Sequence, residues 1–299
     1  MSASEIFVRE AGTGASVAYS QHRVSFSSAD APWRDLMRLE RCIKALDSTE
    51  VDLLWTGIGL VQSEGALDYR FDGEPMRSTA LKPGDLWLYP QGATVYVSMP
   101  IPVELTQVQI APRVFTAVAE ELRCPARVIG NGLTRAEQVS LMVARLEAEV
   151  RTGCPGGRLF GEQLAYALAG RLVCPTAAAP AQSSERALPK RRLAAVLDYI
   201  HANPTEQLAL EDLARMARLS PFHFSRLFKG STGMTPHQYV LRWRVEESKR
   251  LLRHSNMEIA DIAQRLRFSD QSHFTSLFHR LTGETPRRWR DDPRNPRGD

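Results

Sequence analysis

Residues 259–289 read IADIAQRLRFSDQSHFTSLFHRLTGETPRRW, and residues 210–239 read LEDLARMARLSPFHFSRLFKGSTGMTPHQY. The two stretches align when one is shifted along the other, with one extra residue entering at Asp270 or Gln271. This part of the chain is therefore an internal duplication, called copy one (210–239) and copy two (259–289) below. The matched residues include Ala214 and Ala263, Phe224 and Phe274, Leu227 and Leu277, Phe228 and Phe278, Gly233 and Gly283, and Pro236 and Pro286.

Each copy has the pattern of a helix-turn-helix. A short helix carries an alanine where a second helix must approach closely, and Ser220 or Ser269 then stands at the N-cap position of the second helix. The second helix buries its two phenylalanines and a leucine at i, i+3, i+4 spacing. Gly233 and Gly283 suit the left-handed end of that helix, and the proline three residues later begins the next one. We therefore predict two helix-turn-helix units.

The duplicated segment closely resembles the DNA-binding domain of the AraC/XylS family of transcription regulators, above all in IADIAQRLRFSDQSHFTSLFHRLTGETPRRWR. The resemblance implies a DNA-binding domain over residues 190–292. A sensor or dimerisation domain is then expected over residues 1–175. Residues 176–189 are rich in Ala, Pro and Ser and have no periodicity, which is typical of a linker.

The charge is divided unevenly along the chain. Residues 187–299 carry 20 Lys and Arg against 13 Asp and Glu, whereas residues 1–186 carry 18 against 21. A basic half is expected of a surface that meets phosphates, although basic helical surfaces are common.

The cysteines, Cys42, Cys124, Cys154 and Cys174, are scattered without a CxxC pair. This spacing argues against a zinc finger or a disulfide framework and suits a reducing cytosol. The chain has no run of 18 apolar residues, and its first residues lack an apolar signal core. We expect a cytoplasmic protein without a membrane partner.

Residues 51–99 are expected to form β-structure. Their short runs are rich in Val, Leu, Tyr and Trp and are broken by Gly, Pro and Asp. KPGD at 82–85 fits a type II turn. Many short strands indicate a sandwich or small barrel, and KPGDLWLYPQG at 82–92 is similar to the cupin-like sensor half of arabinose-type regulators.

Three helices are expected after the strands. Pro112 begins the first, Thr134 caps the second with Glu137 completing a capping box, and residues 158–173 form the third. Their apolar stripes suit packing on the outside of the barrel, and the resemblance implies that such helices also pair two subunits in a homodimer. The predicted fold class is α+β with two domains: an N-terminal cupin-like β-barrel with appended helices, and a C-terminal all-α domain with two helix-turn-helix units.

A recognition helix presents its outward, N-terminal residues to base edges in the major groove. Because the phenylalanines and leucine face inward, the outward residues are the candidates for contact with double-stranded DNA, and the family's base-reading residues fall at the same positions. Arg226 can contact O6 and N7 of a guanine, and Gln271 can bridge N6 and N7 of an adenine. The candidate DNA-binding residues are Phe222, His223, Ser225, Arg226 and Lys229 in copy one, and Gln271, Ser272, Thr275, Ser276 and His279 in copy two.

Enzyme chemistry is not indicated. His22 is the only histidine before residue 201, so the His-rich metal set of cupin enzymes cannot be assembled, and no GxSxG, Walker or GxGxxG motif is present. A fused DNA-repair methyltransferase would need clustered cysteines. We therefore predict no catalytic residues, no metal and no cofactor.

What remains for the N-terminal domain is sensing. The resemblance implies that a small-molecule effector binds inside the barrel. It also implies that the protein is an activator and contacts RNA polymerase, as most members of the resembled family do. The alternative is a ligand-independent regulator whose first domain only dimerises or docks a partner protein. The candidate effector-binding residues are Trp55, Tyr69, Arg70, Trp87 and Tyr96.

Overall fold

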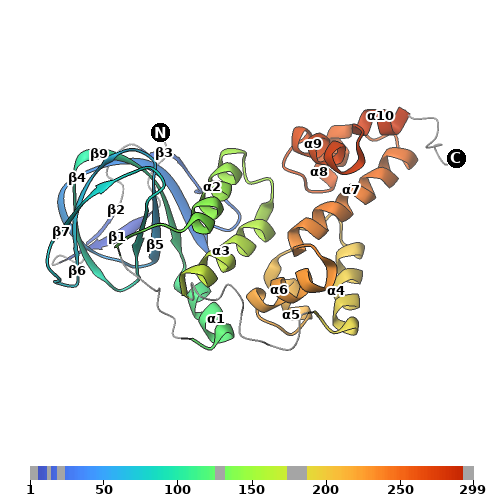
Figure 1. Ribbon diagram of the computed structural model, residues 1–299. Helices are drawn as coiled ribbons and strands as arrows, with labels where there is room; N and C mark the ends of the chain where they lie inside the picture. Colours follow the sequence, from blue (N-terminus) through green and yellow to red (C-terminus); the bar gives the residue numbers. More distant parts are fainter. Residues whose placement is uncertain (1–5, 12–14, 19–23, 125–131, 174–186, 292–299) are drawn as a thin grey trace. The chain divides into compact units, whose positions relative to one another are not determined.

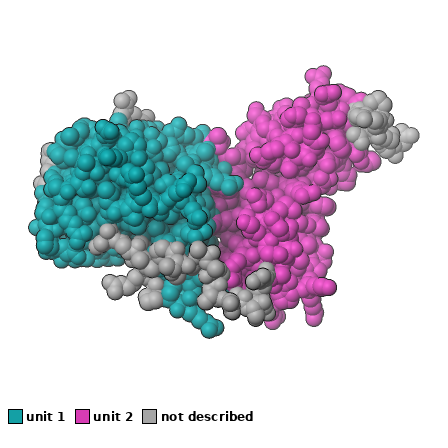
Figure 2. Space-filling model, viewed as in Figure 1, with its two compact units in different colours: residues 1–151, 164–181 teal, residues 152–163, 182–299 magenta. Residues whose placement is uncertain are grey.

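The computed structural model describes residues 6–11, 15–18, 24–124, 132–173 and 187–291 of the chain. Two compact units divide it (Figure 2), and each is described by itself. Unit 1 comprises residues 1–151 and 164–181, and unit 2 comprises residues 152–163 and 182–299. Most of the predicted linker, 176–189, lies outside the described residues.

Unit 1 is built on one antiparallel sheet, drawn in blue to green in Figure 1. Its main path runs β10-β8-β5-β9-β4-β1-β2, with β3 paired to β4, and β6 paired to β7 and β9. The strands are β1 (Phe7–Glu10), β2 (Ser16–Ala18), β3 (Val24–Ser27), β4 (Met37–Asp52), β5 (Thr56–Val61), β6 (Gly65–Phe71), β7 (Arg77–Leu81), β8 (Leu86–Tyr89), β9 (Thr94–Ile110) and β10 (Gly132–Thr134).

The long strands β4 and β9 organise this sheet. They pair along most of their length, while the first part of β9 also pairs with β6 and its last part with β5. The predicted β-structure is confirmed, and so is the turn at 82–85, where Gly84 has φ 89° and the Asp85 N–H donates to the Lys82 carbonyl at 3.0 Å. Among the described strands, β10 and β2 end the main path unpaired with each other, so the expected closed barrel is not borne out.

The inner face of the sheet carries the main core of unit 1. Tyr69, Phe71 and Trp87 meet there, with ring centroids 4.5 to 6.0 Å apart. The same face also carries Lys44, whose side chain is completely buried. Burial lowers the pKa of Lys44 to about 7, and the charges of Cys42 and Glu40 oppose this shift. The core of the sheet thus contains an ionisable group that is half neutral near pH 7.

Three helices accompany the sheet: α1 (Pro112–Leu122), α2 (Glu137–Arg151) and α3 (Gly157–Val173). All three predicted helices are confirmed, but the expected capping box of the second is wrong. Thr134 belongs to β10, where it pairs with Leu86, and the helix begins only at Glu137. The sequence pattern placed the helix start too early because a strand residue has the same side chain as a good cap.

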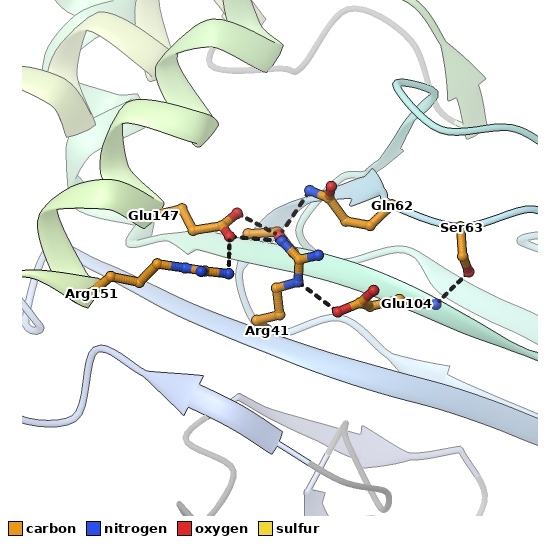
Figure 3. Close-up of polar contacts among 7 residues, drawn as sticks. Arg41, Gln62, Ser63, Glu104, Glu147 and Arg151 are labelled. Carbon is orange, nitrogen blue, oxygen red and sulfur yellow. Dashed lines mark hydrogen bonds and ion pairs between the residues drawn. The ribbon is translucent and has the colours of Figure 1, made fainter.

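A polar network fixes α2 to the sheet (Figure 3). The Glu147 carboxylate accepts from Arg41 at 2.7 Å and from Thr106 Oγ1 at 2.9 Å. Arg41 also donates to Glu104 at 2.9 Å, and Gln62 donates to Thr106 at 3.1 Å. These bonds join β4, β9 and α2, so an ion pair rather than apolar contact alone sets the position of α2.

Unit 2 is helical apart from short connections. After the start of α3, its helices are α4 (Lys190–Ala202), α5 (Leu210–Met216), α6 (Pro221–Thr232), α7 (Pro236–His254), α8 (Ile259–Arg265), α9 (Gln271–Thr282) and α10 (Pro286–Asp291). The pairs α5–α6 and α8–α9 are the two predicted helix-turn-helix units, and α7 runs from one pair to the other (Figure 1). Within the described ranges, no helix combines the length and the apolar character that crossing a bilayer requires.

Candidate nucleic-acid interface

The second helix of each pair is capped at both ends, as its sequence requires. The Ser220 side chain accepts from the His223 N–H at 3.2 Å, and Gly233 and Gly283 end α6 and α9 with φ of 75° and 83°. In copy two the expected cap is wrong. Asp270, not Ser269, is the N-cap of α9 and accepts from the His273 N–H at 2.7 Å. The extra residue of copy two moves the cap one position along and supplies a stronger, charged acceptor.

The core of each pair leaves one helix face free. Phe224 and Phe228 in α6 and Phe274 and Phe278 in α9 are fully buried, with neighbouring rings 5.4 and 5.6 Å apart. The leucine at the i+3 position is buried with them in each copy. Each helix therefore has one fixed orientation, and the residues of its opposite face are determined.

The turn of each pair contains an arginine in the left-handed conformation. Arg218 has φ 54° and Arg267 has φ 59°. In both turns the next residue donates its N–H to the alanine of the short helix at 3.0 Å, Leu219 to Ala214 and Phe268 to Ala263. No sequence pattern marks these positions, because an arginine rarely adopts this conformation.

The structure brings the candidate DNA-binding residues together on α6 and α9, and the two sets differ in exposure. In copy two, Gln271, Ser272, Ser276 and His279 are exposed, and Thr275 is half-buried. In copy one only Lys229 is exposed, and the remaining candidates are half-buried: Phe222, His223, Ser225 and Arg226.

A depression of about 590 Å³ lies beside α9. Gln271 and Thr275 line it from α9, and Arg287 and Arg290 line it from α10. The starts of α8 and α10 form its remaining sides. Sequence reasoning missed the two arginines, although Arg287 directly follows the repeated Thr-Pro. They place positive charge beside the candidate reading helix, and Glu258 and Asp291 line the same depression. Arginine side chains of this kind commonly contact phosphates.

Arg244 holds the two copies in one body. From α7 its guanidinium donates to the carbonyls of Pro204 at 3.1 Å and Glu206 at 2.7 Å, before α5, and of Arg267 at 3.4 Å, after α8. Arg267 in turn donates to the Thr205 carbonyl at 3.0 Å. Burial lowers the pKa of Arg244 to about 10, and the charge of Arg267 adds to this shift. The relative position of α6 and α9 is therefore set by these hydrogen bonds as well as by α7.

The candidate effector residues do not share one surface. Tyr69 and Trp87 lie in the inner core with ring centroids 4.5 Å apart. Arg70 instead pairs with Glu50 and lies 5.2 Å from the centroid of the Tyr96 ring, on the opposite side of its strand. The fifth candidate, Trp55, lies under the guanidinium of Arg38. Among the described residues, no group of three His, Cys, Asp or Glu side chains is placed to hold a metal ion.

Comparison with known families agrees with this geometry. A family described as a helix-turn-helix domain matches residues 213–292, which contain most of copy one and all of copy two. The C-terminal helix-turn-helix segment is an AraC-type domain. The family match thus falls on the duplicated part of the chain.

Two curated relatives align with about 95 residues of this chain. Over 95 residues the chain is 39% identical to the "Bifunctional transcriptional activator/DNA repair enzyme AdaA" of Bacillus subtilis, and the aligned segment covers 32% of this chain and 45% of that protein. Over 96 residues it is 36% identical to the "HTH-type transcriptional activator RhaS" of Shigella boydii, covering 32% and 34%. The DNA-binding domain of AdpA, solved with a target DNA, is 31% identical with a TM-score of 0.32, covering 33% of this chain and 90% of that one. The chain thus spans less than half the length of these curated relatives.

Proposed function

We propose that this protein is a sequence-specific DNA-binding transcription regulator, and that its N-terminal domain senses a small effector, dimerises, or does both. The observation that carries the proposal is the pair of matched helices, α6 and α9, held in one compact unit with their polar faces outward. The basic charge of this half of the chain and the arginines beside α9 support it.

The two helices would read successive major grooves on one face of a duplex, about 34 Å apart. Arg226 would fork onto a guanine and Gln271 would bridge an adenine, since these side chains match the donor and acceptor pattern of those bases. Arg287 would hold a phosphate, because it lies at the start of α10 beside the reading helix rather than on it. Because the copies carry different side chains, one subunit's site would be asymmetric.

Selection of bound fragments from random duplex DNA tests the proposal, followed by binding titrations over every single-base variant of the selected site. Where both reading helices contact the duplex, we expect Arg226→Ala to cost about 1–3 kcal/mol and to relax the preference at one base. Arg287→Ala is the matched control, which should weaken binding to all variants alike and reduce the salt dependence of log K by about one unit of slope. Failure to select any preferred duplex at moderate salt would contradict the proposal, and a uniform loss with Arg226→Ala would move that residue to a phosphate.

Transcription activation and RNA polymerase as a partner belong to the same proposal. Two relatives carry "transcriptional activator" in their names. We propose that the protein has no enzymatic activity. We also propose that it forms a homodimer, in which α2 and α3 of a cupin-like sensor domain pair the two subunits.

A small polar effector is supported by polar atoms buried on the inner face of the sheet. The register places Gln107 opposite Glu40 on one side and Gly59 on the other, and Gly59 opposite Trp87. Within the described protein, Trp87 Nε1, Gln107 Oε1 and Gln109 Nε2 are buried without a hydrogen-bond partner. A bound molecule with both donors and acceptors would satisfy them, since buried polar atoms are normally paired.

Thermal melting of the full chain against a library of small polar metabolites separates a sensor from a ligand-independent regulator. A ligand present at 100 times its Kd should stabilise the protein by about 2.7 kcal/mol and raise its melting temperature. Gln109→Leu should reduce that rise, whereas Arg70→Leu, on the other side of the sheet, should leave it. If no compound shifts the melting temperature, the ligand-independent alternative is favoured.

A further inference from the structure

In copy two a depression of about 590 Å³ lies beside α9, between the starts of α8 and α10. The alignment of the two copies identifies the corresponding positions of copy one. In order from copy one to copy two, they include Leu210 and Ile259, Ser225 and Thr275, and His237 and Arg287.

In copy one the start of α3 contacts two of these positions, Leu210 and His237. Residues 152–163 belong to the same compact unit as both copies, so the contact lies within unit 2. The Glu162 carboxylate accepts a hydrogen bond of 2.6 Å from the Leu210 N–H, and Arg158 donates to its other oxygen at 2.6 Å. The ring of Phe160 packs against that of His237 with centroids 5.5 Å apart.

Matched residues are more buried in copy one, where α3 contacts them, than in copy two. Leu210 and Glu162 are fully buried, whereas Ile259 is only half-buried. His237 is half-buried, whereas Arg287 at the matched position is exposed. The cover of copy one therefore reaches the start of α5 and the start of α7, which correspond to two sides of the open depression.

We propose that the first turns of α3, residues 158–162, are an autoinhibitory segment that must leave copy one before both helix-turn-helix units can bind DNA together. This rests on the proposed function. The first helix of a helix-turn-helix crosses the DNA backbone, so the Glu162 carboxylate at the start of α5 repels the phosphates there. The Phe160 ring occupies space at the start of α7. Copy two, with its open depression and two arginines, is free to bind in the same state.

Docking of α3 on copy one has a desolvation cost at Glu162. Burial raises the pKa of Glu162, with the charge of Glu211 adding to it, while the Leu210 N–H and Arg158 oppose the shift. The ionised carboxylate is thus desolvated while it is docked, and release returns it to water. The remainder of α3, from Leu164 onward, belongs to unit 1, so one continuous helix carries residues of both units. An event in unit 1 that repositions α3 therefore acts directly on copy one.

The test is a hydroxyl-radical footprint and a binding titration of the full chain on the duplex selected by the wild-type protein. We expect the wild-type footprint, without effector, to cover one major groove. Phe160→Ala and Glu162→Ala should extend it by one helical turn of DNA and lower Kd about fivefold or more. Glu162→Gln keeps the size and removes the charge, so it provides a second reading if Glu162→Ala fails to fold. Arg171→Ala, later on the same helix, is the control that should change neither footprint nor Kd.

The outcomes separate the two proposals. If the wild-type chain selects no duplex, the proposed function fails. If it selects one and its footprint already spans two grooves, or if the folded variants leave the footprint unchanged, the autoinhibitory segment is overturned while the proposed function stands.

Discussion

Replacing Arg244 by alanine is expected to lower the free energy of unfolding of unit 2 by about 3 kcal/mol or more. The guanidinium makes three hydrogen bonds to main-chain carbonyls, two of them at 3.1 Å or shorter, and Arg244 is itself buried. Hydrogen bonds to charged groups contribute about 1.5–3 kcal/mol each. Urea unfolding of the full chain, resolved by hydrogen exchange of peptides from α4 to α10, measures the loss.

Two further substitutions make the Arg244 result specific. Arg242→Ala changes an exposed arginine two residues away on α7 and should stay within about 0.5 kcal/mol of wild type. Arg244→Lys should recover only part of the loss, because a point-like ammonium cannot reach three carbonyls in the fixed directions of a guanidinium. Equal stability of Arg244→Ala and Arg242→Ala would show that the two copies hold together without these bonds.

The stability of unit 1 is expected to rise with pH above neutrality because of Lys44. Its pKa is about 7 in the folded chain and 10.5 in the unfolded chain. Between these values the unfolded chain binds more protons, so raising the pH favours folding. This contribution is fully present above pH 10.5 and is lost as the pH falls through 7. Each pH unit is worth at most about 1.4 kcal/mol, which gives about 2 kcal/mol between pH 7 and pH 9.

Denaturant unfolding at several pH values, compared between wild type and Lys44→Met, isolates this effect because the other titrations cancel. The Lys44→Met chain should lack the additional rise of about 2 kcal/mol between pH 7 and pH 9. Lys82→Met removes an exposed lysine of the same unit and should keep the rise. A rise of the same size in Lys44→Met would mean that another group titrates in this range.

The duplicated half of the fold was predictable because its determinants are local. The paired phenylalanines, the glycine at each helix end and the proline after it act within one or two turns of helix, and each appears in the structure where the pattern placed it. The exception is the cap of α9, since an insertion moves the cap without changing the pattern around it. The candidate DNA-binding residues follow from the same periodicity, because burying one face of a helix defines the other.

The rest depends on contacts between residues far apart in the chain, which a local pattern does not contain. Glu162 and Leu210 are separated by 48 positions, and Arg41 and Glu147 by 106. The effector candidates show the same limit. Residue type alone marks aromatic residues on strands as candidates. Whether such a side chain points inward depends on register, which places Tyr69 and Tyr96 on opposite faces.

The helix α7 also works as a spacer of fixed length. Its 19 residues span about 28 Å, close to the pitch of B-form DNA, and each residue advances 1.5 Å while turning by about 100°. A single amino acid inserted in the middle of α7 would move α9 little along the duplex but rotate it by slightly more than a quarter of a full turn. Evolution within this architecture can therefore exchange the side chains that read bases far more easily than it can alter the distance between the two places where they read.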